Sequence, residues 1–221
     1  VSMADADAYA PSRYPAACAD VRDITLFPAA YVDLCRFTGR EDIRDWAVHC
    51  RHIGFYGVKL HPRLGDFDLT HPLLSDVIRV ANECGLTPLL CTYPYSAAHD
   101  SRRLGVDSIV DLLRLVPDQR LVLLHGGTTR LLDLAEATRH FKRTLLDLSY
   151  TLCEYAGSSL DLDLRFVMDR CRSRVCIGSD SPEFAPARMR QRFESLTVDF
   201  SHEHRMAIAS ENMFAFTHLP R

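Results

Sequence analysis

The sequence has 221 residues, of which 47% are hydrophobic and 25% are charged, a composition typical of one globular domain with a substantial core. The formal net charge of -3 gives no basic surface that would recruit nucleic acid or an anionic membrane. No apolar run approaches the roughly 18 residues of a membrane-spanning helix, and the first residues lack a signal-peptide pattern. We therefore expect one cytoplasmic domain over residues 1–221 that acts on a small-molecule substrate.

The eight cysteines are scattered along the chain, and none belongs to a Cys-x-x-Cys pair. In a chain of this length, such spacing is typical of free thiols in a reducing compartment rather than of a disulfide framework. We therefore expect unpaired thiols, with Cys84 and Cys176 packed as small apolar side chains.

Short apolar runs alternate with segments of helical spacing along the chain. The pattern predicts strands at residues 23–28, 57–62, 87–91, 121–125, 144–148 and 174–177. It predicts helices at residues 41–53, 73–84, 106–116, 128–140, 160–171, 186–195 and 201–214. The chain is therefore expected to be a series of consecutive strand–helix units.

Repeated strand–helix units form either a closed (β/α)8 barrel or a doubly wound open sheet. The predicted strands are apolar almost throughout, as in parallel sheets that are covered on both faces. Polar side chains lie at or just past the end of nearly every strand, namely Lys59, His61, Thr92, Tyr93, His125, Ser149 and Asp180. A barrel arranges its chemistry around such a rim, whereas an open sheet concentrates it at one switch point. We therefore expect an α/β fold of the TIM-barrel type, with Asp180 in its mouth.

Four motifs occur in order, namely Gly57-Val58-Lys59-Leu60-His61-Pro62, His125-Gly126-Gly127, Gly178-Ser179-Asp180-Ser181-Pro182 and Glu211-Asn212-Met213-Phe214-Ala215-Phe216. Together they resemble the later part of the amidohydrolase superfamily, and most closely the amidohydrolase-related branch that includes aminocarboxymuconate semialdehyde decarboxylase. The resemblance covers about residues 20–216. It implies a (β/α)8 TIM-type barrel that holds a divalent metal, usually zinc, through a His-x-His pair from strand one, a histidine from strand five and an aspartate from strand eight.

The metal ligands of that family are matched only in part. Asp180 matches the strand-eight aspartate, and His125 matches a strand-six histidine that binds metal or assists the chemistry. Cys91 stands where strand five is expected to end in histidine, and a thiolate is a competent zinc ligand. No His-x-His pair precedes Lys59, and the pattern His202-Glu203-His204 lies at the start of a predicted helix. The metal set that the resemblance implies is therefore Asp180, His125 and Cys91.

The first residues suggest why the pair is missing. Val1-Ser2-Met3 resembles the end of the family's second strand, and residues 4–22 resemble the loop after it. We expect the first strand and its histidines to lie upstream of this sequence; the alternative is a naturally shortened protein that has lost its metal pair. A barrel that lacks its first strand has unpaired sheet edges. We therefore expect the chain to be marginally stable or to associate into homo-oligomers.

The resemblance implies a hydrolase in which a metal-activated water attacks a small, carboxylated or cyclic substrate. Asp180 would take the proton of the water and pass it to the leaving group, and His125 would stabilise charge on the substrate oxygen. Lys59 and His61 lie two positions apart on one strand, point the same way and suit a substrate carboxylate. The loops after the strands offer further contacts to a polar aromatic or carboxylated ligand, from Tyr93, Tyr95, His99, Arg102, Arg103, Tyr150 and Tyr155.

Each assignment has a structural alternative. Asp180 could cap the turn in Ser-Asp-Ser-Pro, and His125 and Cys91 could be packed residues at strand ends. Lys59 and His61 could be solvated rim residues. Two other functions also stay open, namely a decarboxylase of the same family and a metal-free barrel that serves as a scaffold. The retained Asp180 and His125 favour an enzyme, whereas Cys91 and the absent pair favour the scaffold.

Overall fold

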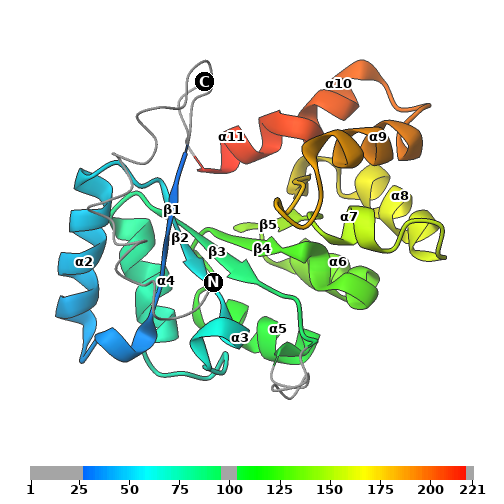
Figure 1. Cartoon of the computed structure of the whole chain (residues 1–221). Helices are drawn as coiled ribbons and strands as arrows, with labels where there is room; N and C mark the ends of the chain where they lie inside the picture. The colour runs from blue at the N-terminus through cyan, green and yellow to red at the C-terminus, as the bar shows by residue number, and fades with distance from the viewer. Residues whose placement is uncertain (1–26, 96–103, 218–221) are drawn as a thin grey trace.

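The computed structural model describes residues 27–95 and 104–217, which form one parallel sheet with helices between its strands (Figure 1). The strands are β1 (Ala29–Tyr31), β2 (Gly57–Leu60), β3 (Thr87–Cys91), β4 (Leu121–Leu124), β5 (Thr144–Asp147) and β6 (Val175–Cys176). The α-helices are α2 (Arg40–His52), α3 (Pro62–Gly65), α4 (Leu74–Glu83), α5 (Val106–Leu115), α6 (Leu131–His140), α7 (Thr151–Glu154), α8 (Leu160–Arg170), α9 (Pro186–Leu196), α10 (His202–Met206) and α11 (Asn212–Thr217).

Strands that are neighbours in the chain are also neighbours in the sheet. The order is β1-β2-β3-β4-β5-β6, and every adjacent pair is parallel. Successive strand–helix units of a barrel produce this order, whereas a doubly wound sheet reverses its order part-way. The topology therefore confirms the barrel-type fold. Because all strands run the same way, the residues that follow them meet at one rim.

Alternate residues of the strands pack on opposite faces of the sheet. On one face, Leu121 and Leu123 of β4 belong to the main core, which they share with the surrounding helices. On the other face, Val122 and Leu145 form a smaller cluster against Phe216 of α11. Figure 1 shows α11, in red, extending from α10 back across the sheet. The face that would line the inside of a closed barrel is thus partly covered by the last described helix.

Most predicted elements are confirmed to within a few residues, but three differ. Of the strand predicted at residues 23–28, only the last two residues are described, and they precede β1. The helix predicted from residue 128 begins instead at Leu131, because a 3-10 turn with non-helical dihedral angles occupies His125–Arg130. The helix predicted at residues 201–214 is divided into α10, a π-helical turn at Ala207–Glu211, and α11.

Several sequence predictions lie outside the described residues. These are the strand end at residues 1–3, the loop at residues 4–22, and the loop side chains of His99, Arg102 and Arg103. Within the described ranges the cysteines are free thiols, as expected, and Cys176 is buried. No helix in those ranges combines the length and the apolar character that crossing a membrane requires.

We expect Leu123→Ala to lower the free energy of unfolding by about 2–5 kcal/mol, because it opens a cavity in the centre of the sheet. Leu123 is 0% exposed, whereas Leu115 at the end of α5 is 57% exposed. The matched control Leu115→Ala should therefore change the free energy of unfolding by no more than about 0.5 kcal/mol. Urea denaturation measures both values. Equal losses for the two variants would contradict the packing described above.

Candidate active site

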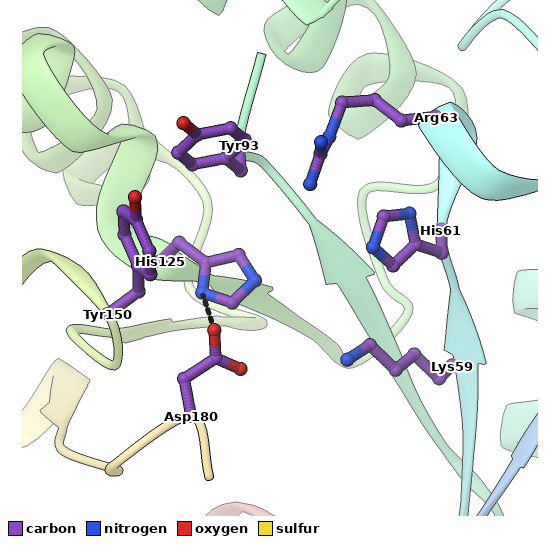
Figure 2. Close-up of a pocket in the computed structure, with 7 residues that line it drawn as sticks. All are labelled: Lys59, His61, Arg63, Tyr93, His125, Tyr150 and Asp180. Carbon is purple, nitrogen blue, oxygen red and sulfur yellow. Dashed lines mark ion pairs between the residues drawn. The ribbon is translucent and has the colours of Figure 1, made fainter. Parts of the chain in front are cut away.

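The predicted site residues meet in one pocket at the carboxyl ends of the strands. The pocket is lined by Lys59, His61, Arg63, Tyr93, His125, Tyr150 and Asp180, whose side chains converge as Figure 2 shows. The cavity between these side chains measures about 100 Å³ and opens to solvent. The five predicted catalytic and substrate-binding residues therefore lie together, and Arg63 and Tyr150 complete the lining.

β2 supplies one side of the pocket through Lys59 and His61. His61 lies at the N-cap of the short helix α3, and its Nδ1 accepts the backbone N–H of Leu64 at 3.3 Å. Its Nε2 points toward His125 (Figure 2). Lys59 is half-buried and has no ion-pair partner among residues 27–95 and 104–217. His61 thus combines a structural cap with a nitrogen directed into the pocket.

Arg63 is a pocket residue that the sequence analysis missed. Its guanidinium lies 4.5 Å from the centre of the Tyr93 ring, and one of its terminal nitrogens donates to the carbonyl oxygen of Tyr95 at 3.2 Å. Its Nε is buried and has no hydrogen-bond partner in the described part of the chain. Such an arginine has donors left for a ligand in the pocket that Lys59 also lines. The only sequence signal was its place two residues after His61, on a helix too short to predict.

His125 is held in a strained turn at the end of β4. His125, Gly126 and Gly127 all have positive φ, at 69°, 58° and 71°. The turn is fixed by two buried threonines: Thr151 Oγ1 donates to the carbonyl oxygen of His125 at 2.6 Å, and Thr92 Oγ1 accepts the N–H of Gly127 at 3.0 Å. Positive φ is unfavourable for a residue with a side chain and is found preferentially at functional sites. The paired glycines of the motif therefore serve this turn.

Asp180 lies opposite His125, and the structure brings the two predicted catalytic residues together. Asp180 Oδ2 is 3.9 Å from His125 Nδ1 (Figure 2). Asp180 also has a positive φ, at 54°, and its side chain is 32% exposed, whereas that of His125 is 6% exposed. One partner is therefore accessible to water while the other is shielded, an arrangement suited to proton transfer.

Cys91 lies beneath the pocket at the end of β3 and is fully buried. Burial acts to raise the pKa of the Cys91 thiol, but its hydrogen bonds with His125 and His61 outweigh burial and hold that pKa well below the usual range. Burial likewise acts to lower the pKa of His125, but the hydrogen bond and charge of Cys91, with the charge of Asp180, raise it. The contact between Cys91 and His125 therefore shifts the pKa of each group toward its charged form.

Two tyrosines close the pocket above His125. The rings of Tyr93 and Tyr150 meet edge to face with centres 5.0 Å apart, and Tyr150 lies 6.1 Å from the His125 ring. Burial, followed by a hydrogen bond with Tyr93, raises the pKa of Tyr150. Tyr150 has a positive φ of 62°, so its backbone is strained like those of His125 and Asp180. The aromatic wall suits a flat or cyclic ligand.

Asp147 and Ser149 are buried next to His125, on the side of its Nδ1 atom. The Ser149 hydroxyl lies 3.3 Å from His125 Nδ1 and also donates a short hydrogen bond to Asp147. Asp147 was missed because it lies within a predicted strand. A carboxylate in the apolar run Thr144 to Leu148 is nevertheless a signal, since buried charges occur where they are paired or functional.

The described donors do not by themselves fit the zinc that the resemblance implies. Within residues 27–95 and 104–217, no group of three or more His, Cys, Asp or Glu side chains is arranged to hold a metal ion. The Nδ1 atoms of His61 and His125 already have protein partners. His204 of the His-x-His pattern is buried, stacks on Phe200 and lies 3.0 Å from the carbonyl oxygen of Met168 through Nε2. That pattern therefore packs α10 against the fold.

Comparison with family models and with curated proteins gave no match. Among solved structures, the chain is similar to an uncharacterized TIM-barrel protein from Bordetella bronchiseptica, with a TM-score of 0.77 and 14% identity over 94% of this chain and 72% of that one. It is similar to a protein described as an amidohydrolase from Staphylococcus aureus, with a TM-score of 0.71 and 13% identity over 99% of this chain and 82% of that one. The chain therefore has the TIM-barrel fold of these proteins.

A third structure of similar fold carries ligands. It is a 5-carboxyvanillate decarboxylase from Novosphingobium aromaticivorans with bound manganese and 3-methoxy-4-hydroxy-5-nitrobenzoic acid; its TM-score is 0.63, with 13% identity over 95% of this chain and 70% of that one. At these identities the similarities establish the fold. They confirm the fold expected from the four sequence motifs.

We expect Asp147→Asn to be at least as stable as the parent protein at neutral pH. Burial is the main cause that raises the pKa of Asp147 above its ordinary value of 3.8. Protonated Asp147 therefore stabilises the folded state fully at a pH below the pKa of this group in the unfolded chain. This stabilisation is lost as the pH rises through the higher pKa that Asp147 has in the folded protein. The asparagine does not titrate, so urea unfolding should depend less on pH in that window. The exposed variant Asp133→Asn is the control, and equal pH slopes for parent and Asp147→Asn would refute this expectation.

Proposed function

We propose that this chain carries the catalytic rim of an amidohydrolase-type barrel that hydrolyses a small carboxylated or cyclic substrate. The observation that carries the proposal is the approach of Asp180 Oδ2 to within 3.9 Å of His125 Nδ1 in a pocket that also presents Lys59 and Arg63. An acid–base pair in a pocket with two cationic side chains suits the hydrolysis of an anionic molecule.

The proton transfers can be assigned to the two catalytic residues. Asp180, the more exposed of the pair, takes a proton from the water whose oxygen attacks the substrate carbonyl carbon. His125, whose pKa is raised by its contacts with Cys91 and Asp180, donates an N–H to the developing negative oxygen and then gives that proton to the leaving group as the bond to that group breaks. Solvent returns the proton from Asp180 to His125, which restores the starting state.

Lys59, His61 and Tyr93 bind the substrate in this proposal, and Arg63 joins them. Lys59 supplies a point charge, and Arg63 supplies planar donors that suit a carboxylate. The Tyr93 ring lies against the Arg63 guanidinium and provides a flat apolar surface for a ring of the substrate. The pocket thus combines anion recognition with aromatic contact.

A metal centre would need further ligands besides those that the described residues provide. The resemblance implies zinc, and the similar decarboxylase structure holds manganese. Asp180 and His125 are the residues here that would contribute to such a centre, with Cys91 beneath them. The proton transfers above use the chain's own groups, and none passes through a metal.

Decarboxylation is the second candidate reaction. The decarboxylase of similar fold was crystallised with a substituted benzoic acid, and the cationic and aromatic groups of this pocket suit such a ligand. In that case Asp180 or His125 would protonate the carbon that loses carbon dioxide. Release of carbon dioxide instead of ring opening distinguishes the two reactions.

We expect Asp180→Asn and His125→Gln each to lower kcat by about 100-fold or more, the usual contribution of general acid–base catalysis. A panel of carboxylated cyclic esters and aromatic carboxylic acids, followed by product analysis and carbon dioxide detection, provides the assay. Asp133→Asn, at an exposed carboxylate on α6, should retain full activity. If the parent protein converts no member of the panel, the proposed hydrolase and decarboxylase functions both fail.

We expect Lys59→Met to raise KM by about 10- to 100-fold for carboxylated substrates, because it removes a hydrogen bond to a charged group. Its effect on kcat should be smaller, since Lys59 binds the substrate and takes no part in the proton transfers. Lys142→Met is a closely matched control, because Lys142 is the chain's other lysine and is exposed. Steady-state kinetics of both variants measure the difference. An unchanged KM in Lys59→Met would exclude Lys59 from substrate binding.

A further inference from the structure

Asp147 is a buried carboxylate that the proposed reaction does not use. It ends β5 and is only 4% exposed. Its Oδ1 accepts the backbone N–H of Ser149 at 3.0 Å and a very short hydrogen bond from the Ser149 hydroxyl. The thiol of Cys176 lies 3.7 Å from its Oδ2. Because a buried carboxylate is costly unless it is hydrogen-bonded, these contacts fix both Asp147 and Ser149 in place.

The segment that carries Asp180 passes directly over Asp147 and Ser149. A Cβ atom on Gly178 would lie 3.4 Å from Asp147 Oδ2 and 3.2 Å from Ser149 Cβ. The second distance is shorter than ordinary van der Waals contact, so the glycine permits this close approach. The glycine of the Gly-Ser-Asp motif therefore brings Asp180 and the Asp147–Ser149 pair to the same side of His125.

The hydroxyl of Ser149 has one proton, and that proton is committed to Asp147. Only lone pairs of Ser149 Oγ remain for His125 Nδ1, which lies 3.3 Å away. Asp180 Oδ2, 3.9 Å from the same nitrogen, is also an acceptor. A hydrogen on Nδ1 satisfies this arrangement, whereas a lone pair there would face two oxygen atoms that cannot donate.

We propose that Asp147, acting through Ser149, is a positioning residue that keeps a proton on His125 Nδ1 and so assigns proton exchange with the substrate to His125 Nε2. Nε2 points away from Asp180 and into the space in front of His61 (Figure 2). The assignment of the Nδ1 proton rests on the hydrogen bonds alone. Only its consequence for catalysis rests on the proposed function.

The experiment is a measurement of the His125 tautomer by nitrogen NMR. The chain is labelled with ¹⁵N-histidine, and long-range proton–nitrogen correlations at a pH where the ring is neutral show which nitrogen carries the hydrogen. His125→Gln identifies the signals. We expect the Nδ1–H tautomer to predominate in the parent protein, to lose its predominance in Ser149→Ala, and to persist in Asp147→Asn, whose side-chain oxygen still accepts from Ser149.

The matched control is Ser158→Ala, because Ser158 is an exposed serine that donates to the carbonyl oxygen of Tyr155; it should leave the His125 signals unchanged. An Nε2–H tautomer in the parent, or an unchanged tautomer in Ser149→Ala, would overturn the proposal. In the activity assay, Ser149→Ala should lower kcat about tenfold or more with little change in KM, and Asp147→Asn should keep most of the activity. If the parent is inactive on the panel, the proposed function fails while the NMR result still decides this inference.

Discussion

Parallel pairing of the strands in chain order brings the residues that follow each strand to one rim of the sheet. The register is fixed by backbone hydrogen bonds, which align Lys59 of β2 with Leu89 of β3 and Leu90 with Leu123 of β4. Side chains alternate between the faces, so a shift by one residue would exchange pocket and core positions along a whole strand. The pocket therefore depends on the same hydrogen bonds that hold the sheet together.

Several rim residues have an unfavourable backbone conformation, and buried polar groups hold one of these turns in place. His125, Tyr150 and Asp180 have positive φ values, each of which costs about 1–3 kcal/mol for an ordinary residue. Thr92 and Thr151 hold the His125 turn from below through hydrogen bonds to its backbone. A strained backbone conformation persists only where the surrounding contacts stabilise the fold by more than the strain costs. Two of these three residues, His125 and Asp180, are the proposed acid–base pair, so part of the stability cost falls at the site.

The electrostatics of the pocket are set by what lies beneath and behind His125. Cys91 lies below the ring and favours its protonated form, while Asp147 and Ser149 lie behind and direct its Nδ1 hydrogen. Lys59 and Arg63 face the opening and supply positive charge. In the proposed function, His125 and Asp180 form the proton-exchanging side of the pocket, whereas Lys59 and Arg63 form its anion-binding side.

The sequence by itself determined the strand–helix alternation, the rim positions of Lys59, His61, His125 and Asp180, and the barrel-type fold, because apolar periodicity and strand-end polar residues are local signals. It missed the late start of α6, because the Gly126-Gly127 turn that displaces it depends on contacts with distant threonines. The sequence by itself singled out neither Arg63 nor Asp147. Only the tertiary structure decided the roles of these two residues, because their partners come from other parts of the chain. Parallel pairing of β2 and β3 brings Tyr93 close to Arg63. Pairing of β4 and β5 brings His125 close to Ser149, which in turn contacts Asp147.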